Sequence, residues 1–113
     1  MEISAPTRAH EMYTQAREVL AGGVSSSFRA SVKPEPLFID RGEGAYVVDV
    51  DGVRYLDCTL AWGPLILGHC PAVVIDAIRS VLETGTSFGA PTEREIELAE
   101  EIASCVPSME QVR

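Results

Sequence analysis

Arg29 is an arginine in a long loop, and its guanidinium is a group that could bind a small anionic ligand. It lies within residues 22–36, where Gly, Ser and Pro are frequent and disfavour both a helix and a central strand. Loops of this length inside a compact domain are usually functional or disordered. An arginine fork can donate two parallel charge-assisted hydrogen bonds to a carboxylate. From the residues alone, Arg29 is therefore either a carboxylate-binding group or a solvated surface charge.

Few other groups could perform covalent chemistry. Lys33 is the only lysine, and its place in the same polar loop predicts a solvated surface amine. Cys58, Cys70 and Cys105 are widely spaced and form no C-x-x-C pair, which predicts reduced thiols and no metal site. Cys70 follows His69, but sequence neighbours rarely aim at one another. We therefore expect a turn there rather than a nucleophile and its base.

The composition restricts the classes of partner. The 113 residues carry a net charge of −8, with 46% hydrophobic and 23% charged residues, as in an ordinary folded domain. The negative charge disfavours binding to nucleic acid or to anionic lipid. No apolar stretch approaches the roughly 18 residues of a membrane span, and the first residues lack a signal pattern. The sequence predicts a cytoplasmic protein with no nucleic-acid or membrane partner.

The elements that would position the loop begin with an amphipathic helix at residues 7–21, because apolar residues recur there at intervals of three and four. Alternating apolar and polar residues predict three strands, at residues 37–41, 45–50 and 54–58. Turn signals at residues 42–44 and at Asp51-Gly52 separate these strands. We therefore expect an antiparallel meander.

The second half of the chain predicts an irregular segment and two helices. Residues 59–69 are almost wholly apolar but contain glycine and proline, which predicts a buried segment whose backbone approaches a neighbour. Pro71 suits the first position of a second helix. Thr92 and Glu95 form a capping box that begins a third. The fold is therefore predicted to be α+β, with more apolar surface than so small a body covers, so we expect a further part of the chain or a partner to cover it.

Four sequence motifs are shared with a known family. They are D-V-D-G-x-R-Y-x-D at residues 49–57, W-G-P-x-I-L-G-H at 62–69, S-F-G-A-P-T-E at 87–93 and V-P-S-M-E-x-V-R at 106–113. The chain thereby resembles class III pyridoxal-phosphate-dependent aminotransferases, most closely those of the glutamate-1-semialdehyde aminomutase kind. Ser27 stands where these aminomutases usually carry proline, which favours a related aminotransferase. Gly68-His69-Cys70-Pro71 is one residue shorter than their G-H-x-H-P.

The resemblance implies that residues 1–113 are the amino-terminal segment of a fold-type I transferase, without its large cofactor-binding domain. The family uses pyridoxal 5′-phosphate, and its Schiff-base lysine lies outside this chain. We therefore expect no catalytic residue here and no activity from the chain alone. The whole enzyme would be an aminotransferase, or an aminomutase and thus an isomerase, acting on a small amino or keto carboxylate.

Site residues are also implied by the resemblance. Arg29 would face the substrate carboxylate with Ser26 nearby, and Trp62 would be either core or a wall of the active-site entrance. Four loop residues would lie near the active site and the interface of a homodimer: Thr86, Ser87, Phe88 and Gly89. The partners would be the remainder of the aminotransferase chain and a second copy. The alternative is a stand-alone, non-catalytic binding or dimerisation module derived from the same family.

Overall fold

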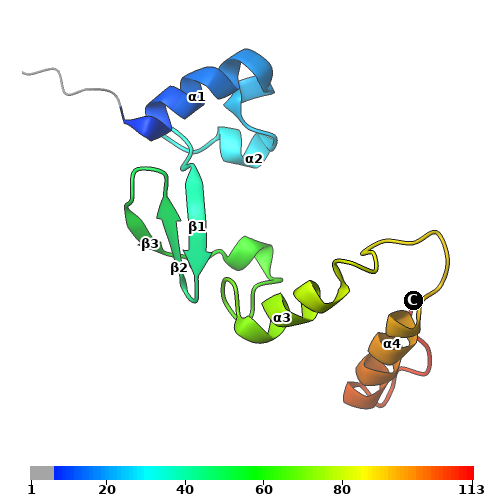
Figure 1. The fold of residues 1–113 in the computed structure, drawn as a ribbon. Helices are drawn as coiled ribbons and strands as arrows, with labels where there is room; N and C mark the ends of the chain where they lie inside the picture. Colours follow the sequence, from blue (N-terminus) through cyan, green and yellow to red (C-terminus); the bar gives the residue numbers. More distant parts are fainter. Residues whose placement is uncertain (1–6) are drawn as a thin grey trace, which may run out of the picture. The chain divides into compact units, whose positions relative to one another are not determined.

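The computed structural model describes residues 7–113 and has the predicted α+β composition (Figure 1). The chain divides into two compact units, one ending at Ile75 and the other beginning at Asp76. The division falls within α3 (Ala72–Val81).

The first unit begins with α1 (Arg8–Val19), which confirms the first predicted helix. Its N-terminus is capped twice. The Thr7 hydroxyl accepts a hydrogen bond from the backbone N–H of His10 at 3.3 Å. The carboxylate of Asp51, which lies 43 residues along the chain from Arg8, accepts from the backbone N–H groups of Arg8 and Ala9 at 2.8 and 3.1 Å. These acceptors satisfy N–H groups that no helix can pair internally, so α1 is tied to the sheet.

The sheet is the predicted three-stranded antiparallel meander, with β2 between β1 and β3 (Figure 1). Its strands are β1 (Ile39–Glu43), β2 (Tyr46–Asp49) and β3 (Arg54–Leu56). The first strand starts two residues later than predicted and continues through Glu43. The first turn is consequently tighter than the sequence indicated, with Gly44 at a φ of +55°, a conformation that glycine adopts readily.

Asp49 closes the turn between β2 and β3. It is buried, and its carboxylate accepts hydrogen bonds from the backbone N–H groups of Asp51 and Val53 and from the Tyr55 hydroxyl, at 3.0, 2.8 and 2.9 Å. Burial alone would raise the pKa of Asp49, but these hydrogen bonds outweigh it and lower the pKa. Asp49 is thus an ionised acceptor around which the hairpin turns.

The glycine- and serine-rich segment is more helical than predicted. A 3₁₀ turn, η1 (Ala21–Gly23), is followed by one turn of helix, α2 (Ser27–Ala30). The prediction of a continuous loop over residues 22–36 is therefore wrong for α2. Ser26 is extended, and its carbonyl accepts from the N–H of Ala30 at 3.2 Å, so a local bond closes the turn.

Residues 59–69 are irregular, as predicted, but several of their side chains are not buried. The exposed fractions of Trp62, Ile66 and Leu67 are 72%, 84% and 61%. The backbone, in contrast, is held closely: His69 and Gly44 exchange two backbone hydrogen bonds, at 2.7 and 3.0 Å. The predicted close approach of the backbone is therefore confirmed. Within the described residues these three side chains are not buried, which matches the expectation that the chain exposes more apolar surface than it covers.

The second unit contains the end of α3 and α4 (Glu93–Cys105). Pro71 lies just before α3 rather than at its first position. The capping box of α4 is confirmed, since the Glu95 carboxylate accepts from the backbone N–H of Thr92 at 2.7 Å. The predicted apolar stripe of α4 is partly sheltered at Ala99, Ile102 and Ala103, whereas Ile96 is exposed.

Within the described residues 7–113, no aliphatic, aromatic or cysteine side chain is fully buried, and many large apolar side chains are exposed. None of the helices in this part of the chain has the length and apolar character that crossing a membrane requires.

Candidate functional site

A pocket of about 410 Å³ in the first unit brings together two of the residues singled out from the sequence, Arg29 and Trp62. Arg29 comes from α2 and Trp62 from the 3₁₀ turn η2 (Leu60–Trp62). The rest of the wall is mainly apolar: Phe28, Val32, Pro36, Leu37, Ile39, Val47, Asp57, Thr59 and Ala61. A cation in a largely apolar hollow suits a small ligand that has a carboxylate and a nonpolar body.

An aromatic pair forms one wall of this pocket. The rings of Phe28 and Trp62 meet edge to face, with centroids 4.8 Å apart and planes inclined by 85°. This is a favoured arrangement for two aromatic rings, because the positive edge of one meets the negative face of the other. The contact joins α2 to η2, so the positions of Arg29 and Trp62 are linked.

Arg29 is oriented by a neighbouring serine that the sequence did not single out. Its Nη2 donates a hydrogen bond to Ser25 Oγ at 3.0 Å. Ser26, the predicted neighbour, does not line the pocket; its carbonyl accepts the bond that closes α2. Because Ser25 precedes α2, helical spacing in the sequence does not identify this pair.

Trp62 lies at the end of a turn whose backbone is left-handed. Leu60, Ala61 and Trp62 have φ angles of +49°, +52° and +69°, so three successive residues with side chains adopt the left-handed region. Each such residue costs roughly 1–2 kcal/mol relative to the right-handed form. Strain of this size persists only where surrounding contacts enforce it, and it is concentrated at functional sites.

The Asp57 carboxylate accepts hydrogen bonds from the backbone at the start of this turn. Its Oδ1 accepts from the backbone N–H groups of Thr59 and Leu60 at 2.8 and 3.1 Å, and its Oδ2 accepts from His69 Nε2 at 2.8 Å. The side chains of Asp57 and His69 are only 13% and 18% exposed. The hydrogen bond from His69, aided by the two backbone donors, lowers the pKa of Asp57. The sequence prediction did not identify this pair.

The predicted loop at residues 86–89 lies in the second unit. Thr86, Ser87 and Phe88 line a pocket of about 600 Å³ together with residues of α3 and α4, whereas Gly89 does not line it. Phe88 is exposed and stands over Gly85, where an added Cβ would lie 2.8 Å from Phe88 Cζ. The loop therefore presents an exposed aromatic ring, Phe88, that lies against Gly85.

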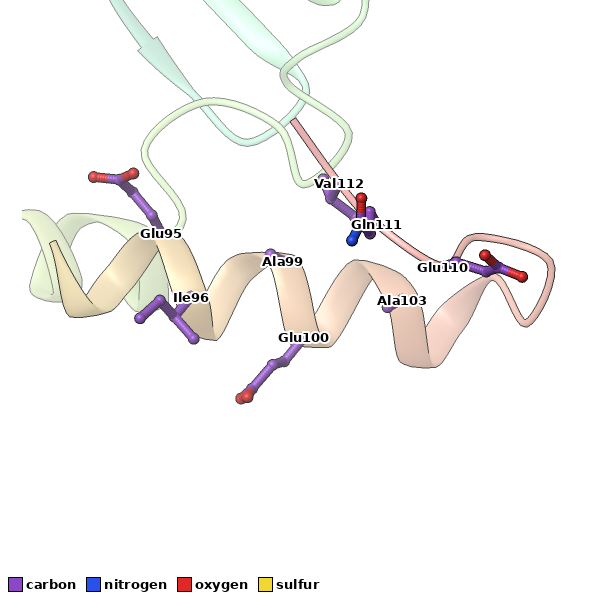
Figure 2. A pocket seen from close by; sticks show the side chains of 8 residues that line it. All are labelled: Glu95, Ile96, Ala99, Glu100, Ala103, Glu110, Gln111 and Val112. Carbon is purple, nitrogen blue, oxygen red and sulfur yellow. The ribbon is translucent and has the colours of Figure 1, made fainter. Parts of the chain in front are cut away.

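A third pocket, of about 440 Å³, lies between α4 and the segment that follows it. Figure 2 shows this segment running back alongside the helix, with Ala99 and Ala103 on the helix side that faces it. Glu95, Glu100 and Glu110 stand among its lining residues. No site residue predicted from the sequence lies there, and its acidic rim does not suit a carboxylate ligand.

Neither a metal nor pyridoxal phosphate finds its usual ligands among the described residues. No group of three or more His, Cys, Asp or Glu side chains within residues 7–113 could hold a metal ion. Cys58, Cys70 and Cys105 are free and exposed. Lys33 is exposed and does not line the pocket that contains Arg29.

Comparisons with known proteins agree on one family. The family described as "Aminotransferase class-III" matches residues 27–113. The glutamate-1-semialdehyde 2,1-aminomutase of Alkaliphilus metalliredigens (strain QYMF) is 51% identical over 108 residues, which are 94% of this chain and 24% of that protein. An omega-transaminase from Sphaerobacter thermophilus shares 36% identity with a TM-score of 0.86, over 96% of this chain and 24% of its own.

A solved transaminase with bound pyridoxal phosphate shares 38% identity with a TM-score of 0.75, over 83% of this chain and 22% of its own. The chain thus spans about a quarter of the length of the relatives it matches. The family match covers most of the chain, and the resemblance extends to both sequence and three-dimensional structure. This chain belongs to the class III aminotransferase family.

Proposed function

We propose that this chain is the substrate-recognition segment of a pyridoxal-phosphate-dependent aminotransferase or aminomutase, in which Arg29 binds the carboxylate of a small amino or keto acid. The observation that carries the proposal is the pocket that Arg29 and Trp62 line together. Ser25 orients the guanidinium, and a planar fork can hold a carboxylate through two parallel hydrogen bonds. Phe28 and Trp62 would then enclose the nonpolar part of the ligand.

The cofactor in this proposal is held by residues outside the chain described here. When bound, pyridoxal phosphate acts as the electron sink for reactions at the amino-bearing carbon. Family membership and the similarity to a transaminase with bound cofactor support this assignment. The residues of this chain would bind and orient the substrate, and would exclude water from one side of it.

We also propose that the loop at residues 86–89 lies near the active site and the interface of a cytoplasmic homodimer. Exposed Phe88, supported by Gly85, offers an apolar contact of the kind that is covered on assembly. A stand-alone dimerisation module would use the same exposed residues. Only an enzyme is expected to need the orientation of Arg29, so a kinetic test separates the two.

The test substitutes Arg29 in the longer enzyme that carries this segment together with the cofactor-binding domain. Arg29→Lys keeps the charge and loses the fork. Hydrogen bonds to charged groups contribute about 1.5–3 kcal/mol, so kcat/KM for the carboxylate substrate should fall roughly tenfold to a hundredfold. Cofactor absorbance should be unchanged.

Arg41→Lys is the matched control, because Arg41 pairs only with its exposed neighbour Asp40 among the ion pairs of the described residues. Its kcat/KM should stay within about twofold of the parent. If Arg29→Lys and Arg29→Ala both behave like this control, Arg29 is a solvated charge and the proposal is wrong.

A further inference from the structure

We infer that Asp57, held by His69, is the positioning residue that fixes Trp62 against Phe28 at the pocket. The inference concerns the geometry of the pocket and does not depend on which reaction the pocket serves. It rests on three connected contacts: one from the sheet to His69, one from His69 to Asp57, and one from Asp57 to the left-handed turn.

The first contact fixes His69 on the meander. Its backbone is paired with Gly44 through two hydrogen bonds, at 2.7 and 3.0 Å. Its ring lies against Gly42, where an added Cβ would be 2.5 Å from His69 Cγ and 2.6 Å from Nδ1. A side chain at position 42 would therefore displace the ring, so glycine there leaves the room that His69 occupies.

The second and third contacts connect His69 to the left-handed turn through Asp57. His69 Nε2 donates to one carboxylate oxygen of Asp57, and the other oxygen accepts from the N–H groups of Thr59 and Leu60. Those two N–H groups open the left-handed turn that ends at Trp62, and the N–H of Trp62 donates to the Thr59 carbonyl at 3.0 Å. With both oxygens engaged, the carboxylate sets where the strained turn begins.

Trp62 itself reports on this arrangement, since it is the only tryptophan in the chain. The tryptophan band of the near-UV circular dichroism spectrum depends on the fixed orientation of the indole beside Phe28, whereas the far-UV spectrum reports secondary structure. A positioning role should affect the first signal and spare the second. A role in overall stability would affect both together.

The experiment compares variants of the 113-residue chain, with Trp62→Phe defining the band. Asp57→Ala removes both oxygens and should abolish the band while far-UV ellipticity is retained. Asp57→Asn keeps an oxygen for the two backbone donors and should retain the band. Asp40→Ala, at an exposed carboxylate in β1 that pairs with Arg41, is the matched control and should change neither signal.

Gly42→Ala tests the same contacts without changing Asp57 or His69, because the added methyl group would displace the His69 ring. It should also abolish the band without loss of far-UV ellipticity. The inference is overturned if Asp57→Ala retains the tryptophan band, or if the near-UV and far-UV signals of Asp57→Ala and Gly42→Ala are lost together.

Discussion

Ala61→Gly should stabilise this protein, although alanine-to-glycine changes usually do the opposite. Ala61 has φ and ψ of +52° and +32°, in the middle of the left-handed turn. Relief of that conformation is worth roughly 1–2 kcal/mol, from which the extra freedom of glycine in the unfolded chain subtracts about 0.4–1 kcal/mol. The net gain is therefore about 1 kcal/mol in the free energy of unfolding.

The assay is thermal and denaturant unfolding followed by far-UV circular dichroism. For a unit of this size, about 1 kcal/mol raises the melting temperature by roughly 4–8 °C. Ala16→Gly is the matched control, because Ala16 lies within α1, where glycine costs roughly 0.8–1 kcal/mol. The two variants should thus shift stability in opposite directions. If both lower it to a similar degree, position 61 is not under left-handed strain.

Lys33 should not be labelled specifically when the chain is mixed with pyridoxal phosphate and reduced with borohydride, since its amine is exposed and outside the pocket; stoichiometric labelling of Lys33 would contradict this. The chain should self-associate, because Trp62, Ile66 and Leu67 are exposed, and sedimentation showing a monodisperse monomer would count against it. The pKa of Asp57 is lowered, so its ionised form contributes stability above the ordinary aspartate pKa and loses it as the pH falls through the depressed value. The Trp62 band should therefore persist between about pH 7 and pH 4, because Asp57 stays ionised throughout that range. Its disappearance above pH 5 would refute that assignment.

The elements that depend on local sequence signals, such as alternation, turn residues and helix caps, could be predicted from the sequence. The meander follows from alternating side chains and the Asp51-Gly52 turn, and α4 follows from the Thr92–Glu95 capping box. Contacts between residues far apart in the sequence could not be predicted in the same way. The sequence predicted that the backbone of residues 59–69 approaches a neighbour, but only the structure identifies that neighbour as Gly44.

The candidate site also depends on contacts between residues that are far apart in the sequence. Arg29 and Trp62 are separated by 33 positions, and only the family resemblance, not spacing or periodicity, suggested that they belong together. No local preference predicts a left-handed turn for Leu60, Ala61 and Trp62, because all three disfavour that region. His69 was considered beside Cys70, but its partner is Asp57, twelve residues earlier.

The bond between Asp51 and the start of α1 has a consequence for synthesis on the ribosome. Arg8 and Ala9 leave the peptidyl-transferase centre long before the carboxylate that caps them exists, since 43 residues separate Arg8 from Asp51. At about 5–20 residues per second this delay lasts roughly two to nine seconds. During that interval the nascent helix lacks this acceptor, and a segment of its length is marginal in water without tertiary support. Translation speed across residues 9–51 therefore sets how long the start of α1 is without this acceptor.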